Sequence, residues 1–169
     1  MWTIALSTGL FHDRPLDECL EPIRAKGFDQ IEICTSPDHL DYRDPEHVGR
    51  VADRLRGLDV RPLSLHAPFA DDLDVSALDE AHQQRAVDAM RQAVDAAARL
   101  GVGFLVIHPG PERGGFPAPE HLQRRKQVAT AMDALAAHCR SCGVRLVMEN
   151  MLPHLFTGHM RDLLWILGA

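Results

Sequence analysis

Two hydrophobic patterns alternate along the whole chain. Stretches with apolar residues three or four positions apart are typical of helices that cover a sheet. A short, continuous apolar run follows each stretch, as expected for parallel strands that are buried on both faces. A glycine separates each stretch from the run that follows, because glycine adopts the left-handed conformation that closes a helix. These glycines are Gly27, Gly57, Gly101 and Gly143.

The apolar runs predict five strands. Their expected ranges are Thr3–Ser7, Gln30–Cys34, Pro62–His66, Gly103–His108 and Val144–Glu149. Repeated strand–helix units give a parallel α/β fold in which the crossovers are right-handed. The sequence therefore predicts such a fold, with a helix after each strand.

The last residues bear on the architecture. Residues 163–168 have the pattern of one more helix with a glycine stop, Gly168, and no further strand follows. A closed (β/α)8 TIM barrel has eight units and about 250 residues. We therefore expect one domain over residues 1–169. It is either a doubly wound sheet of five parallel strands or, if it is a barrel, a partial one with five β-α units and two open edges.

Composition narrows the class of protein. Of the 169 residues, 46% are hydrophobic and 25% are charged, and the formal net charge is −6. The acidic balance argues against nucleic acid as a partner, since nucleic-acid binders normally carry a basic face. No run approaches the roughly 18 apolar residues that a membrane span needs, so we expect no membrane partner. The four cysteines are too few and too scattered for a disulfide scaffold, which favours a cytoplasmic location.

Four predicted strands carry a polar residue near the carboxyl end. These residues are Glu32, His66, His108 and Glu149. The carboxyl ends of parallel strands form the active-site face, and core packing does not require charge there. Imidazole and carboxylate together are ligands of Mn, Zn, Co or Mg ions. A lone histidine at a strand end is more often structural, but the whole set predicts a divalent-metal site.

The segments around these residues resemble the xylose isomerase-like TIM-barrel superfamily. This superfamily contains sugar and sugar-phosphate isomerases and epimerases, together with endonuclease IV-like enzymes. The resemblance rests on Ile31–Ile33, Leu65–Phe69, Val106–Gly110 and Val147–Met151. It implies a (β/α)8 barrel of which this chain has the N-terminal five units. The superfamily's other ligands, an Asp, a His and a Glu, come from the sixth to eighth strands and have no counterpart here.

The resemblance implies a role for each strand-end residue. Glu149 matches a glutamate that binds metal in most members and acts as acid or base in the isomerases and epimerases. His66 and His108 match histidines that bind zinc in the endonuclease-like branch. In epimerase-like members the same two positions more often line the substrate pocket. Glu32 matches a strand position that often faces that pocket.

Loop residues add candidates for substrate binding. Phe11 and His12 follow the first strand, where they form either an apolar wall over a ligand or a loop anchor. Asn150 directly follows the last strand. Arg113 lies in the Gly- and Pro-rich loop 109–119, which has the composition of a mobile lid with an anion-binding arginine.

Two further motifs have simpler interpretations. Cys139 and Cys142 form a lone CxxC at the end of a predicted helix, just before Gly143. Zinc ribbons need a second cysteine pair and redox motifs need a helix N-terminus, so we interpret this motif as a helix end. The charge run 124–126 is typical of a solvated helix face.

Three functional hypotheses follow. The leading one is a metal-dependent sugar or sugar-phosphate isomerase or epimerase. In that chemistry a metal-stabilised enediolate forms next to a carbonyl, and Glu149 transfers the proton. The second is an endonuclease IV-like zinc phosphodiesterase that acts on damaged DNA. The third is a non-catalytic partial barrel that associates with another chain, or with a second copy, through its open edges.

Overall fold

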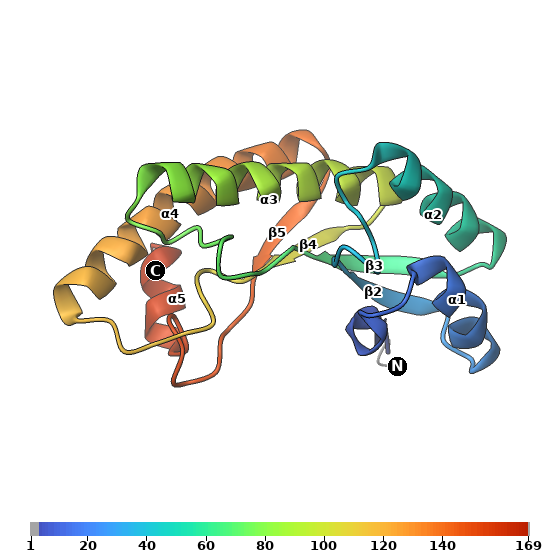
Figure 1. The fold of residues 1–169 in the computed structure, drawn as a ribbon, viewed down its shortest axis with the longest axis horizontal. Coiled ribbons are helices and arrows are strands. Elements are labelled where there is room, and N and C mark those ends of the chain that lie inside the picture. The colour runs from blue at the N-terminus through green and yellow to red at the C-terminus, as the bar shows by residue number, and fades with distance from the viewer. Residues whose placement is uncertain (1–3, 169) are drawn as a thin grey trace.

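Five strands follow one another across a single parallel sheet in the computed structural model, which describes residues 4–168 (Figure 1). The strands are β1 (Leu6–Ser7), β2 (Gln30–Cys34), β3 (Arg61–His66), β4 (Phe104–Ile107) and β5 (Arg145–Met148). Their order in the sheet is β1-β2-β3-β4-β5, and each strand is parallel to the next. Doubly wound sheets reverse their strand order at a switch point, whereas barrels do not. The partial barrel is therefore confirmed, and the doubly wound alternative is wrong.

Helices connect successive strands and lie mainly along one side of the sheet (Figure 1). Asp79 caps the start of the helix Glu80–Leu100, because its carboxylate accepts the N–H of His82 at 2.8 Å. Gly101 ends that helix in the left-handed conformation, with φ at 72°. None of the described helices is long and apolar enough to cross a bilayer. The elements are η1 (Thr8–Phe11), α1 (Leu16–Ala25), α2 (Pro45–Gly57), α3 (Glu80–Leu100), α4 (Ala118–Ser141) and α5 (Met160–Ile166).

The strand bounds differ from the predicted ones mainly at the first strand. Ile4 and Ala5 have no strand pairing, and Thr3 lies outside the described residues. β4 ends just before His108, and β5 ends just before Glu149. The backbone N–H of Glu149 still donates to the carbonyl of Ile107 at 3.0 Å, so the ladder holds the backbone of this residue.

The two faces of the sheet have different surroundings. Side chains alternate between the faces of a strand. One set is fully buried under the helices: Ile31, Ile33, Leu65, Leu105 and Ile107. The other set includes Glu32 and Ser64, which are half-buried, and Val147, which is exposed. Burial on both faces was expected, but the helical face is covered more completely than the second face, which is the inner side of the partial barrel.

A buried histidine ties together the loops that follow β1 and β2. His39 Nδ1 lies 2.6 Å from the carbonyl oxygen of Arg14, which can only accept, so Nδ1 carries a proton. His39 Nε2 lies 2.8 Å from Thr8 Oγ1, which also accepts the N–H of Cys34 at 3.0 Å. Thr8 therefore donates its hydroxyl hydrogen to Nε2. The neutral imidazole satisfies every partner, and burial lowers the pKa of His39 below its ordinary value of 6.5.

We expect this histidine to make the protein less stable in mild acid. Below pH 6.5 the unfolded His39 binds a proton that the folded one does not. The free energy of unfolding should therefore fall from that pH down to the lowered pKa of the folded residue, and then level off. Urea unfolding between neutral and mildly acidic pH measures the slope. Because the pKa values of His108 and His121 are also lowered, the His39 component is the difference from His39→Gln. Identical slopes in the two proteins would contradict the prediction.

Candidate metal centre

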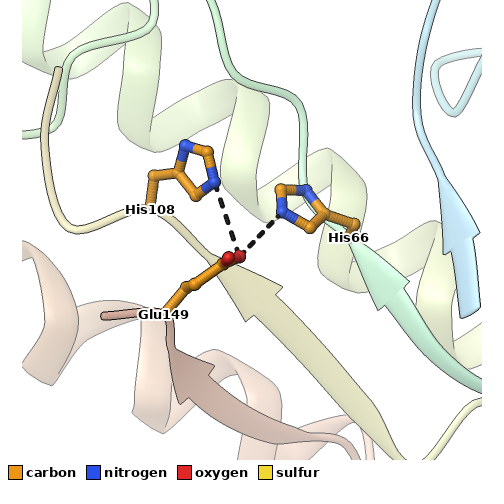
Figure 2. Close-up of side chains that lie close together, drawn as sticks. All are labelled: His66, His108 and Glu149. Carbon is orange, nitrogen blue, oxygen red and sulfur yellow. Dashed lines mark hydrogen bonds and ion pairs between the residues drawn. The ribbon is translucent and has the colours of Figure 1, made fainter. Parts of the chain in front are cut away.

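Three side chains from neighbouring strand ends converge on the inner face of the sheet (Figure 2). His66 ends β3, His108 follows β4, and Glu149 follows β5. Glu149 Oε2 lies 3.1 Å from His66 Nε2 and 3.5 Å from His108 Nε2. The parallel register produces this convergence, because it brings three successive carboxyl ends to one edge.

The hydrogen bonding of His66 determines what its ring offers to the carboxylate. His66 Nδ1 lies 3.0 Å from the carbonyl oxygen of Ala67, so a neutral ring would carry its proton on Nδ1. Nε2 then presents a lone pair to Glu149, whose ionised carboxylate is also an acceptor. Acceptors that face one another at 3.1 Å need a cation or a proton between them. This donor set therefore fits a divalent cation.

The spacing between the carboxylate oxygen and each imidazole nitrogen agrees with metal ligation. Nitrogen and oxygen ligands about 2.0–2.1 Å from a tetrahedral zinc ion lie about 3.3–3.4 Å from one another. The distances from Glu149 Oε2 to the two histidines, 3.1 and 3.5 Å, bracket this value. All three ligand atoms lie within 4.8 Å of one another.

Burial keeps the two imidazoles in place and leaves the carboxylate accessible. The side chains of His66 and His108 are each 11% exposed, whereas that of Glu149 is 44% exposed. The two imidazole rings meet edge to face, with centroids 4.9 Å apart. Burial lowers the pKa of His108. A neutral His108 can bind metal without first losing a proton.

Two residues beside the centre were missed by the sequence reasoning. The ring of Phe69 packs 5.3 Å from that of His66 and 4.7 Å from that of His108. Glu112 Oε1 lies 3.4 Å from His108 Nδ1. This contact does not have the geometry of a hydrogen bond, since His108 Nδ1 is buried without a hydrogen-bond partner among the described residues, but a carboxylate at this position is the usual partner of the outer nitrogen of a metal-binding histidine. Phe69 lies in the segment Leu65–Phe69 that carries the family resemblance, which is the signal that could have marked it, whereas nothing in the loop sequence marks Glu112.

Glu32 does not join the three converging side chains. It lies in the middle of β2, where its carboxylate accepts hydrogen bonds from Ser7 Oγ at 3.1 Å and Ser64 Oγ at 2.9 Å. The strand-end position belongs instead to Cys34, which pairs in register with His66. Burial raises the pKa of the Cys34 thiol, which keeps it protonated. Glu32 thus lies one layer deeper on the inner face than expected, since side chains of alternate residues share a face.

The loop candidates lie around the centre without bonding to it. Phe11 is packed against the core, as a loop anchor would be. His12 is exposed, and its Nδ1 lies 3.2 Å from a carbonyl of its own loop. Asn150 is exposed, and the guanidinium of Arg113 lies 5.2 Å over the ring of Phe116. Within residues 4–168, no hydrogen bond or ion pair links these four candidates to His66, His108 or Glu149.

A sequential parallel sheet with two histidines and a carboxylate at its strand ends defines a barrel protein with a candidate metal centre. Residues 20–167 match the family described as xylose isomerase-like TIM barrel. The chain belongs to this family, which confirms the resemblance seen in its strand-end segments.

Individual proteins resemble this chain at low sequence identity. An uncharacterised protein of Methanocaldococcus jannaschii is 25% identical over 156 residues, which are 89% of this chain and 51% of that protein. A D-tagatose 3-epimerase-like protein has a TM-score of 0.83 and 21% identity, over 98% of this chain and 60% of that one.

Two further solved structures bear on ligands. A D-allulose 3-epimerase from Methylomonas sp., in complex with D-allulose, has a TM-score of 0.74 and 22% identity, over 90% of this chain and 52% of that one. The IOLI protein with a binding zinc atom has a TM-score of 0.78 and 17% identity, over 99% of this chain and 58% of that one. At these identities the likeness shows the fold, and the chain spans between half and 60% of the length of these relatives.

Proposed function

We propose that this chain carries the metal centre of a sugar or sugar-phosphate isomerase or epimerase, which moves a proton next to a carbonyl group. The observation that carries this proposal is the convergence of His66 Nε2, His108 Nε2 and Glu149 Oε2 at the strand ends of a barrel of this family. The similarity to structures named as sugar 3-epimerases supports the substrate class. The zinc atom named for the IOLI structure supports a divalent cation.

His66, His108 and Glu149 would hold the cation, which is of the Mn, Zn, Co or Mg class. When bound, a divalent cation polarises a substrate carbonyl and stabilises the negative charge that develops on its oxygen. The protein contributes two imidazoles. Burial favours the neutral form of His108, and a backbone carbonyl orients the ring of His66. The ring of Phe69 packs against both imidazoles and limits the access of water to them.

In this proposal Glu149 transfers the proton. Its Oε2 faces the two imidazoles, so the other carboxylate oxygen is left to accept a proton from the carbon next to the carbonyl. The side chain is 44% exposed on the inner face, which allows a small sugar to approach. A carboxylate that both contacts the cation and moves the proton would couple stabilisation of the substrate oxygen by the cation to proton transfer at the neighbouring carbon.

Deuterium exchange tests this function on the full chain. The test sugars are D-allulose, D-tagatose and L-ribulose, which are named for solved structures of this fold. We expect Mn²⁺-dependent incorporation of solvent deuterium next to the carbonyl of at least one of them, monitored by proton NMR in D₂O. One carboxylate base can exchange a proton on one face of a carbon, so exchange does not require a second base for inversion. Glu149→Gln should reduce the exchange rate by about 100-fold or more, the usual contribution of a positioned base.

A helix-surface carboxylate provides the control. Glu18 is exposed on α1, and Glu18→Gln should leave exchange unchanged. Equal rates in Glu149→Gln and the wild type would remove Glu149 as the base. If none of the three sugars exchanged a proton while Mn²⁺ was bound, the proposed function would be overturned.

A further inference from the structure

A second group of metal-binding side chains lies among the helices. Asp95 belongs to α3, while His138 lies near the end of α4 and Cys142 directly follows that helix. His138 Nε2 is 2.9 Å from Asp95 Oδ1. The carboxylate oxygen, the imidazole nitrogen and the Cys142 sulfur all lie within 4.8 Å of one another. None of these residues belongs to a strand end, so the group is separate from the centre formed by His66, His108 and Glu149.

The end of α4 holds two of these ligands in a fixed relation. His138 and Cys142 are four residues apart, which places their side chains on the same side of a helix. The N–H of Cys142 donates to the carbonyl of His138 at 3.2 Å, so Cys142 continues the helical turn. The chain then turns away at Gly143, whose φ of 72° requires the left-handed conformation. The thiol is therefore held beside the imidazole by backbone geometry.

The two cysteines of the CxxC motif have different surroundings. Cys139 is 1% exposed within the core, and burial raises the pKa of its thiol to about 11. Cys142 is half-buried and free. Cys139 is thus an inert core residue, as the interpretation of the motif as a helix end implies. Cys142 instead lies beside the imidazole of His138, from its own helix end, and the carboxylate of Asp95, from α3.

We propose that Asp95, His138 and Cys142 bind a divalent transition metal of the zinc class, which joins α3 to α4. Carboxylate, imidazole and thiolate are all zinc ligands, and the sulfur favours zinc or cobalt over magnesium or calcium. The side chains of Asp95 and His138 are 59% and 32% exposed, so an ion can enter from solvent. The carbonyl end of α4 adds negative potential that favours a cation. Three protein ligands leave a further position for water.

Cobalt(II) distinguishes this site from the strand-end centre, because a thiolate ligand adds a charge-transfer absorption that nitrogen and oxygen ligands lack. We expect titration of the full chain with Co²⁺ to produce this thiolate band. Cys142→Ser, which preserves size, should abolish the band and remove one equivalent of cobalt in equilibrium dialysis. Glu149→Ala should keep the band. Asp95→Asn and His138→Gln should each weaken the affinity for Co²⁺ by about 10-fold or more.

Cys34→Ser is the matched control, because Cys34 is the thiol that lies at the strand ends. The band should persist in this variant. Loss of the band in Cys34→Ser but not in Cys142→Ser would place the thiolate ligand at the strand ends and overturn the proposal. Absence of the band at saturating Co²⁺, with helix content intact by circular dichroism, would also overturn it. Neither result depends on whether the chain exchanges protons with sugars.

Discussion

Glu149→Ala is expected to abolish binding of a divalent cation at the strand-end centre while leaving the helix content unchanged. The substitution removes the oxygen on which His66 and His108 converge and the only negative charge among the three ligands. Loss of an outer partner of a metal ligand already lowers affinity by about 10- to 100-fold, so loss of a ligand should cost at least about 100-fold. The fold should tolerate the change because the Glu149 side chain is 44% exposed.

Isothermal titration with Mn²⁺ or Zn²⁺ measures this effect, in a Cys142→Ser background that removes the proposed helix site. Circular dichroism checks the fold of each variant. Glu112→Gln provides a graded comparison, because Glu112 contacts only the outer nitrogen of His108. We expect it to weaken binding by about 10-fold, less than Glu149→Ala does. Unchanged metal stoichiometry in the Glu149→Ala protein would show that this glutamate is not a ligand.

Asp74→Ala is expected to lower the free energy of unfolding by about 3 kcal/mol, since it leaves a buried guanidinium without one of its carboxylates. Arg124 Nη1 lies 2.9 Å from Asp74 Oδ2, and the two side chains are only 9% and 5% exposed. Asp74 also accepts hydrogen bonds from the backbone and hydroxyl of Ser76, at 2.8 and 2.6 Å. Arg124 retains Glu120 at 2.9 Å and the ring of Phe116, 4.3 Å away, so the lower end of the usual 3–5 kcal/mol range applies.

Urea unfolding measures this loss. The control is Asp88→Ala, which breaks an exposed pair with Arg91 whose side chains are 55% and 47% exposed. That change should stay within about 0.5 kcal/mol. A loss in Asp74→Ala no larger than that of the control would show that the buried pair adds nothing. The pair matters to the centre because it joins the connection after β3 to the start of α4, and so fixes the loops that follow His66 and His108.

The strands and the converging ligands could be predicted because their signals are local. A continuous apolar run that ends in a polar residue marks the end of a strand, and parallel pairing then brings successive ends together. The prediction gave β2 its observed bounds and placed His66, His108 and Glu149 at one edge. Glu32 was placed too near that edge because a polar residue in the middle of a strand has the same local appearance as one at its end.

The remaining features depend on partners that are distant in sequence. Arg124 and Arg125 have the pattern of a solvated charge run, but Arg124 is buried against Asp74, fifty residues away, and Arg125 pairs with Asp162. Nothing in the neighbouring sequence marks an arginine whose counter-ion comes from another loop. The approach of Cys142 to α3 likewise depends on how two helices pack, which hydrophobic periodicity does not determine.

The sequential order of the strands also bears on synthesis at the ribosome. Each new strand pairs with the one made just before it, so no strand must wait for a distant segment to form its hydrogen bonds. Pairing between successive units keeps the closed loops short and their entropic cost low. Translation proceeds at about 5–20 residues per second, far more slowly than helices and short loops form. The sheet is therefore suited to vectorial growth from β1, with each emerging β-α unit docking on an edge that is already folded.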